Sequence, residues 1–181
     1  DKSVLHESAS GGAFTAIASY VVRRGGVVFG AAYTDNFVVT HQYVERIEDL
    51  GKFRNSKYVQ SEIQNAYAQC KDFLKQGRIV CFSGVPCQLE GLLRYLRKPY
   101  DNLITVDVLC HSITSPKIFR MYIEAQKRKY GKDISNVMFR DKSPYGYKYS
   151  QMSIYKGDKQ VYKEGVDTDV YLRSFFSDIN V

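Results

Sequence analysis

The feature that most constrains the fold is a strand-helix-strand-helix order in the middle of the chain. Residues 78–82 and 103–109 are rich in β-branched and apolar side chains, which favours two strands. A helical segment follows each, and the second opens with Ser115 as an N-cap and Pro116 in the first turn. This order predicts parallel strands joined by a right-handed helical crossover.

Both helical segments of this unit repeat apolar residues with the period of an amphipathic helix. The predicted inner positions are Leu89, Leu92, Leu93 and Leu96 in the first helix and Phe119, Tyr122, Ile123 and Gln126 in the second. Each helix is therefore expected to cover one face of a sheet.

Other elements flank this unit. On the N-terminal side, residues 14–22 predict a helix closed by Gly25 and Gly26, and residues 27–33 and 37–45 predict an antiparallel hairpin. A charged loop through Lys57 comes next, and then an apolar stripe predicts a helix ending at Gly77. Its positions are Ile63, Ala66, Tyr67, Cys70 and Leu74.

The C-terminal part has strand character and ends in a short helix. Residues 137–140, 148–155 and 160–163 predict antiparallel strands, with a turn at Gly157 and Asp158, before a helix from Asp169. We therefore expect an α/β fold: a mixed sheet with a central parallel β-α-β-α unit flanked by helices, an N-terminal hairpin and C-terminal antiparallel strands.

Length and composition narrow the class of protein. With 181 residues, 44% hydrophobic and 25% charged, the chain is too apolar to be disordered and suits one domain over residues 1–181. No apolar run approaches the roughly 18 residues of a membrane span. The chain begins at Asp1 and ends at Val181 without a tail composition, so we expect an excerpt of a longer protein.

The chain carries a net charge of +7 at pH 7, from 26 Lys and Arg against 19 Asp and Glu. An excess of this sign suits a phosphorylated cofactor, an acidic membrane surface or a nucleic acid. The charge alone does not choose among them.

Two of the four cysteines follow the predicted parallel strands. Cys87 comes after the first strand and Cys110 ends the second, so both are expected at the edge of the sheet where ligands bind in open α/β folds. Such thiols could ligate iron, form a redox pair, act as a nucleophile or lie half-buried beside tight turns. Cys70 and Cys81 fall on a helix stripe and inside a strand, which indicates core positions. Without a secreted disulfide pattern, reduced cytoplasmic thiols are expected.

Further candidate residues lie in loops. Residues 8–12 form a small-residue turn, Ser-Ala-Ser-Gly-Gly, before the first helix, and its backbone N–H groups would point at an anion such as a phosphate. Lys57 and Tyr58 offer a cation and an aromatic face, and Arg140 and Lys142 add positive charge. Each of these also has a purely structural interpretation. The glycine turn could be an ordinary N-cap with flexible glycines, and the charged residues could be solvated surface charges.

One histidine lies beside a candidate reactive group. His111 follows Cys110 and could donate to a cofactor or tune a thiolate, so it is a possible catalytic residue. His6 and His41 are interpreted as structural. The sequence has no HExxH, GxSxG or P-loop motif, which excludes the commonest hydrolase and NTPase signatures.

Five short motifs occur in one order along the chain. They are Ser8-Ala9-Ser10-Gly11-Gly12-Ala13-Phe14-Thr15, Ser56-Lys57-Tyr58-Val59-Gln60-Ser61, Gly84-Val85-Pro86-Cys87-Gln88 with Gly91-Leu92, Cys110-His111 with Ser115-Pro116, and Phe139-Arg140-Asp141-Lys142. Taken together, they resemble the coenzyme F420 hydrogenase/dehydrogenase beta-subunit family, over the range from Ser8 to Lys142.

The resemblance implies a flavin and iron-sulfur protein that passes electrons between FAD, a [4Fe-4S] cluster and a hydride-carrying cofactor or redox partner protein. It implies a single α/β flavin-binding-type domain in which Cys87 and Cys110 are metal ligands. Further ligand cysteines would come from outside the chain, because a cluster normally takes four. The residues that it implies for cofactor binding are Ser8, Ser10, Gly11, Gly12, Ser56, Lys57, Tyr58, Gly84, Pro86, Gln88 and Lys142.

The sequence departs from the family pattern in three places. The ferredoxin-like cysteine array with which many members begin is absent, the cysteine-rich segment that many members carry would come just past Val181, and the usual glycine after Cys-His is Ser112. The use of F420 as substrate does not follow from the resemblance. We expect the glycine turn to face the two cysteines across a shared crevice.

Two alternatives stay open at this point. Pro86-Cys87-Gln88 after a strand is also found in DNA cytosine methyltransferases, with Cys87 as nucleophile, although the Phe-x-Gly-x-Gly cofactor loop is missing. The other alternative is a scaffold that has the fold without the cofactors. The leading hypothesis expects no nucleic-acid partner, no membrane span, a possible oligomer and a cytoplasmic location.

Overall fold

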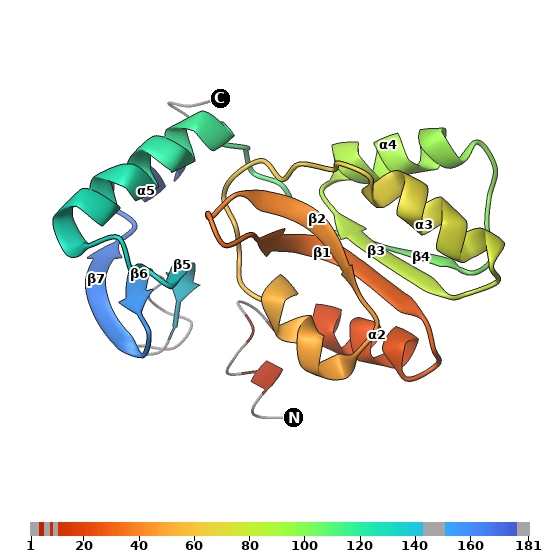
Figure 1. Ribbon diagram of the computed structural model, residues 1–181. Helices are drawn as coiled ribbons and strands as arrows, with labels where there is room; N and C mark the ends of the chain where they lie inside the picture. Colours follow the sequence, from red (N-terminus) through yellow and green to blue (C-terminus); the bar gives the residue numbers. More distant parts are fainter. Residues whose placement is uncertain (1–3, 6–7, 9–10, 143–150, 177–181) are drawn as a thin grey trace. The chain divides into compact units, whose positions relative to one another are not determined.

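The computed structural model describes residues 4–5, 8, 11–142 and 151–176, and the chain divides into two compact units. Unit 1 comprises Asp1–Gly11, Asn55–Gln60 and Ser112–Val181, and unit 2 comprises Gly12–Arg54 and Ser61–His111 (Figure 1). The single domain expected from the length stays a prediction.

Unit 2 is built on a four-stranded mixed sheet. Its strands are β1 (Val27–Tyr33), β2 (Val39–Val44), β3 (Val80–Gly84) and β4 (Leu103–Asp107), in the order β2-β1-β3-β4. β1 and β2 form the predicted antiparallel hairpin, whereas β3 runs parallel to both β1 and β4. The parallel unit predicted from the strand-helix alternation is therefore confirmed.

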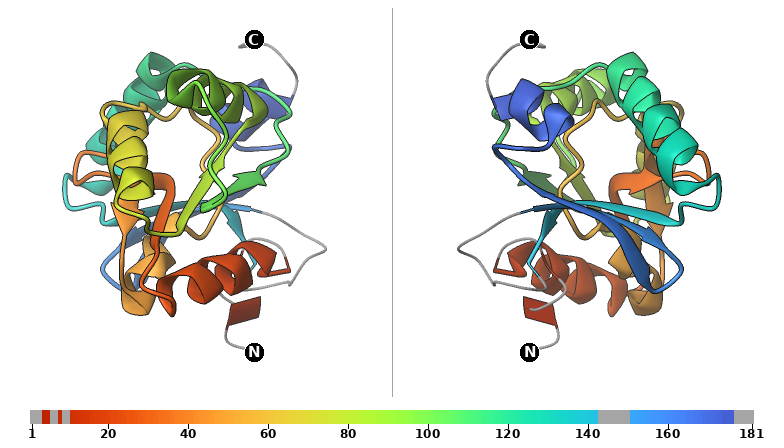
Figure 2. Two further views of the ribbon diagram at one scale, coloured as in Figure 1. Left: turned by 90° about the vertical axis from the view of Figure 1, so that its right-hand side faces the viewer. Right: turned by 90° about the vertical axis from the view of Figure 1, so that its left-hand side faces the viewer.

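Helices cover both faces of this sheet. They are α2 (Ala13–Val22), the 3-10 helix η1 (Ile47–Phe53), α3 (Ala66–Lys75) and α4 (Pro86–Leu96). Figures 1 and 2 show α3 and α4 on one face and α2 on the other.

The alternation of β1 assigns its side chains to the two faces. Val27 and Phe29 belong to the buried cluster with residues of α3 and α4, and Val28 and Ala32 belong to the cluster with α2 and η1. β1 is therefore buried on both faces, as expected for a strand in a sheet that is covered by helices on both sides.

Unit 1 holds a three-stranded antiparallel sheet in the order β5-β6-β7. The strands are β5 (Asn136–Asp141), β6 (Gln151–Lys156) and β7 (Lys159–Gly165). Two helices accompany them, α5 (Pro116–Tyr130) and α6 (Val170–Phe176). All four predicted inner residues of α5 are buried, and the Ser115 hydroxyl accepts the N–H of Lys117, which confirms the predicted cap.

Asp169 ties three elements of unit 1 together. Its carboxylate is fully buried and accepts the hydroxyls of Tyr122 on α5 and Tyr162 on β7, each at 2.7 Å. It also accepts the backbone N–H of Leu172 at 2.7 Å, and so caps the first turn of α6. The carboxylate raises the pKa of both phenols further, in addition to the larger effect of their burial.

Several predicted boundaries and positions were wrong. The strand predicted at 78–82 lies two residues later, and the strand at 103–109 ends at Asp107, leaving Leu109 almost wholly exposed. Leu93 is 49% exposed because it lies on the outer face of α4. The charged loop contains the helix η1, and the first residues of the predicted strand 148–155 lie outside the described residues.

No helix among the described residues is both long enough and apolar enough to cross a membrane.

Candidate functional site

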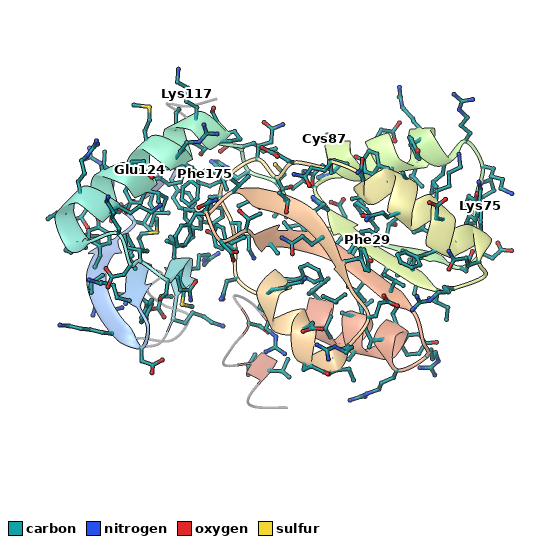
Figure 3. All side chains as sticks on the ribbon, in the orientation of Figure 1. Phe29, Lys75, Cys87, Lys117, Glu124 and Phe175 are labelled. Atoms are coloured by element: carbon teal, nitrogen blue, oxygen red, sulfur yellow. The ribbon has the colours of Figure 1, made fainter. Side chains whose placement is uncertain are left out.

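Two parallel strands of unit 2 end at the same edge. The last residue of β3, Gly84, is in register with Asp107 at the end of β4, and the Gly84 carbonyl accepts the N–H of Val108 at 2.9 Å. α4 begins two residues after β3, so Cys87 lies in its first turn (Figure 3). Cys110 follows three residues after β4. Both cysteines therefore lie on chain that has just left the carboxyl edge of the sheet.

The two thiols interact. Both are exposed. The pKa of the Cys110 thiol is raised by partial desolvation first, then by Cys87 and then by the Asp107 carboxylate. Cys87 and Cys110 are thus brought to one edge, as the parallel topology predicts. They form a pair only, since no group of three or more potential metal ligands occurs in the part of the chain that the structure covers.

Cys70 and Cys81 are in the core, as predicted. Both are fully buried, and burial raises the pKa of each thiol to about 12. Iodoacetamide at neutral pH is therefore expected to alkylate Cys87 and Cys110 at least about a hundredfold faster than the buried pair. Mass spectrometry of the native chain, with an unfolded sample as control, checks this. Equal labelling of all four thiols would contradict the burial.

The side chain of Gln88 is bound at both ends within unit 2. Its Oε1 accepts the N–H of Val85 at 3.2 Å, and its Nε2 donates to the Ser61 hydroxyl at 2.9 Å. A Cβ on Gly84 would lie 3.2 Å from this Oε1, so glycine leaves the space that Gln88 uses. Gln88 and Gly84, which the family resemblance implies for cofactor binding, thus help to build the turn before Cys87. The neighbouring Pro86 is exposed and is the first residue of α4.

Tyr67 also supports this turn. Its hydroxyl donates to the carbonyl of Gln88 at 2.7 Å, and burial and the nearby Cys87 raise its pKa. A Cβ on Gly91 would lie 2.8 Å from the hydroxyl, so this glycine makes room for Tyr67.

Sequence reasoning missed three polar residues at this edge: His41, Ser61 and Tyr67. His41 was interpreted as structural, Ser61 only ended a motif, and Tyr67 only marked a helix stripe. The sequence did carry one signal for this site: His41 falls at an alternating position of a predicted strand. A histidine that is buried there needs hydrogen-bond partners for its ring nitrogens. Its partners lie 20 and 42 residues away, so no local pattern identifies them.

The glycine turn is described in part, since Ser10 lies outside the described residues. The Ser8 hydroxyl donates to the carbonyl of Val4 at 2.6 Å and so closes a local turn. Gly11 has open space where a Cβ would be. Gly12 precedes α2 in a left-handed conformation, with φ of 80°, and belongs to unit 2. The predicted proximity of this turn to the thiols stays a prediction.

The segment Asn55–Gln60 of unit 1 carries the predicted cation. Lys57 donates to the carbonyl of Asn55 at 3.3 Å, and burial lowers its pKa to about 8. The adjacent Ser56 is half-buried. Lys57 is therefore a lysine that changes charge near physiological pH.

Tyr58 holds this segment within unit 1. Its ring stacks on Phe175 at 4.4 Å between centroids, and its carbonyl accepts the Tyr171 hydroxyl at 2.7 Å. One face of the Tyr58 ring, which was predicted to offer an aromatic face, is thus covered by Phe175.

The other predicted site residues lie elsewhere. In unit 1, the Nζ of Lys142 donates to the carbonyl of Leu5 at 3.4 Å. His111, next to Cys110, is exposed and belongs to unit 2.

The fold has a counterpart among solved structures. A chain of the xenon-derivatised F420-reducing [NiFe] hydrogenase complex from Methanosarcina barkeri is similar with a TM-score of 0.62 and 18% sequence identity. The similarity covers 98% of the present chain and 59% of that chain, so the present chain spans well under two thirds of its length. At this identity the likeness shows a shared fold. The sequence matches no curated protein.

The sequence also matches a family model that describes the C terminus of the beta subunit of coenzyme F420 hydrogenase/dehydrogenase, over residues 77–175. The matched segment contains Cys87 and Cys110, whereas the glycine turn and Lys57 precede it. Because the match covers more than half of the chain, this chain belongs to the coenzyme F420 hydrogenase/dehydrogenase beta-subunit family.

Proposed function

We propose that the chain is part of a redox subunit that transfers electrons between FAD, a [4Fe-4S] cluster and a hydride-carrying cofactor or partner protein. The observation that carries the proposal is the pair of exposed thiols, Cys87 and Cys110, at the carboxyl edge of two parallel strands in a member of this family. Family membership supports a redox role and removes the basis for the DNA methyltransferase alternative.

The thiol pair fits half of a cluster's ligand set. A [4Fe-4S] cluster normally takes four cysteine thiolates, and this edge of the sheet supplies two exposed ones. Cys87 lies in the first turn of α4, where the helix dipole stabilises negative charge. We propose that the remaining ligands come from outside this chain, in the longer protein of which it is part.

The residues of unit 1 fit an anionic group such as the FAD pyrophosphate. Gly11 leaves open space beside the backbone, and Lys57 and Lys142 supply cations in the same unit. Both lysine side chains touch backbone carbonyls, which restricts their positions. We propose that these three residues contact FAD, with Ser8, Ser56 and Tyr58 shaping the turns that hold them.

When bound, FAD would accept a hydride as an electron pair, and the cluster would carry electrons singly. The protein would position the two cofactors and would balance the negative charge that they carry. Lys57 and Lys142 would stabilise negative charge on the flavin, and Cys87 and Cys110 would anchor the cluster. We propose a cytoplasmic location, and we propose partner subunits because the chain whose fold it shares belongs to a hydrogenase complex. The hydride carrier stays open, and His111 is proposed only as a residue that could donate to it.

The test is reconstitution of the whole protein under anaerobic conditions, followed by measurement of flavin, iron and sulfide per chain. We expect a yellow-brown protein whose flavin absorbance bleaches on reduction, with four irons per chain for one [4Fe-4S] cluster, about half of whose ligands this edge provides. A colourless protein that retains neither flavin nor iron would contradict the proposal and favour the scaffold alternative.

Lys57 gives the proposal a pH dependence. With a pKa of about 8, its ammonium group is present below that pH and is lost as the pH rises through it. FAD binding that uses this cation should therefore weaken by about tenfold between pH 7 and pH 9.

Equilibrium titration of the flavin-free protein with FAD measures this change. The matched control is Lys57→Arg, whose guanidinium stays charged and should bind FAD equally well at both pH values. A wild-type affinity that does not change with pH would show that Lys57 is not a flavin contact.

A further inference from the structure

We propose that His41 and Ser61 are positioning residues for Cys87, because they anchor a one-way chain of hydrogen bonds that fixes the turn between β3 and α4. This inference deepens the proposed function, which assigns Cys87 as a metal ligand.

The chain of hydrogen bonds starts at the carbonyl of Ser83, at the end of β3. The Nε2 of His41 lies 3.0 Å from this oxygen. A carbonyl oxygen only accepts, so Nε2 carries the proton and donates it. In a neutral ring, Nδ1 is then an acceptor.

The next links follow from this tautomer. Nδ1 of His41 lies 3.0 Å from the Ser61 hydroxyl, which must therefore be the donor. The oxygen of the same hydroxyl accepts from Nε2 of Gln88 at 2.9 Å. At the other end of the amide, Oε1 of Gln88 accepts the N–H of Val85. Each hydrogen bond therefore has one direction, and the chain of bonds closes around the turn that carries Cys87.

The surroundings keep His41 in this state. The ring is 5% exposed and stacks on Phe82 with 5.2 Å between centroids. Burial lowers the pKa of His41, which favours the neutral ring that the chain of bonds requires. The backbone is held as well, since the N–H of His41 donates to the carbonyl of Glu62, beside Ser61, at 2.8 Å.

A core that only needed packing would not require this arrangement. Phenylalanine could stack on Phe82 at position 41 without burying ring nitrogens that need partners. Fully satisfied buried polar networks instead specify one local conformation. At this position, the conformation specified is that of Val85 to Gln88, and it sets where the Cys87 sulfur lies relative to Cys110.

Cadmium binding tests the inference without flavin or iron, because two positioned thiolates bind this soft cation together. Cd²⁺ is titrated into the reduced chain, and the thiolate-to-metal charge-transfer absorbance is followed. We expect His41→Phe to weaken Cd²⁺ binding by about tenfold or more, the usual effect of losing a residue that supports a metal ligand. His41→Gln, whose amide can accept from Ser61 and donate to Ser83, should restore most of the affinity.

The control for stability is Leu92→Ala, which opens a cavity in the core beside α4 and removes none of these hydrogen bonds. It should lower the melting temperature but leave the Cd²⁺ affinity within about twofold of the wild type. Equal affinities for His41→Phe and the wild type would overturn the inference.

A second measurement separates this inference from the proposed function. If Cd²⁺ does not bind the wild-type chain through both thiols, the assignment of the pair as metal ligands fails. Hydrogen exchange at the Val85 amide then decides the positioning role: it should accelerate in His41→Phe and in Ser61→Ala more than the amides of β3 do. Unchanged exchange at Val85 would overturn the role of His41.

Discussion

Replacing Cys87 or Cys110 by serine is expected to reduce the iron and sulfide content of the reconstituted whole protein by at least about tenfold. A serine hydroxyl stays protonated at neutral pH and is a hard donor, whereas iron-sulfur clusters are held by thiolates. Both thiols lie at one edge of unit 2, so under the proposed function each substitution would remove a ligand of the same centre. The effect should be nearly complete for either variant.

Cys70→Ala and Cys81→Ala are the matched controls, because these buried thiols occupy the core on opposite faces of the sheet. They should lower stability while leaving iron per folded chain unchanged. Full iron incorporation by both Cys87→Ser and Cys110→Ser would remove the pair from the ligand set.

Asp169→Ala is expected to destabilise unit 1 by about 4 kcal/mol. The substitution leaves the buried Tyr122 phenol and the partly buried Tyr162 phenol without their acceptor and removes the cap of α6. Unsatisfied buried groups cost about 1–3 kcal/mol each, and a lost N-cap costs about 1 kcal/mol. Urea unfolding, followed by hydrogen exchange in peptides of α5 and β7, measures the change in the free energy of unfolding.

The control for Asp169 is Asp158→Ala, in the exposed turn between β6 and β7, which should change the free energy of unfolding by less than about 0.5 kcal/mol. Asp169→Asn should lie between the two, because the amide oxygen can still accept at the cap. A loss of under about 1 kcal/mol for Asp169→Ala would contradict the three-way role of this carboxylate.

The helices and strands that could be predicted from the sequence are those whose apolar residues recur with a regular local spacing. The inner face of α5 follows from residues spaced three and four apart, and the hairpin of β1 and β2 follows from alternation around a turn. The parallel unit follows from strand and helix order, which allows few topologies. That Cys87 and Cys110 lie at a common edge of the sheet could be predicted for the same reason.

What could not be predicted depends on partners far apart in the sequence. Gln88 was assigned to cofactor binding through the family resemblance, yet its amide is occupied by Ser61 and Val85, and only the folded chain brings Ser61 there. Strand ends were misplaced for a related reason: β-branched residues such as Ile79 and Val108 favour strands locally, but the pairing of β3 with its neighbours decides where each strand ends.

The proposed function requires that Cys87 and Cys110 lie close enough to act on one metal centre. Treatment of the reduced native chain with dibromobimane, which becomes fluorescent when it bridges two thiols, measures whether they do. We expect a fluorescent product in which mass spectrometry identifies one bridge between the peptides of Cys87 and Cys110. Two separately modified thiols without a bridge would show that the pair cannot share one metal.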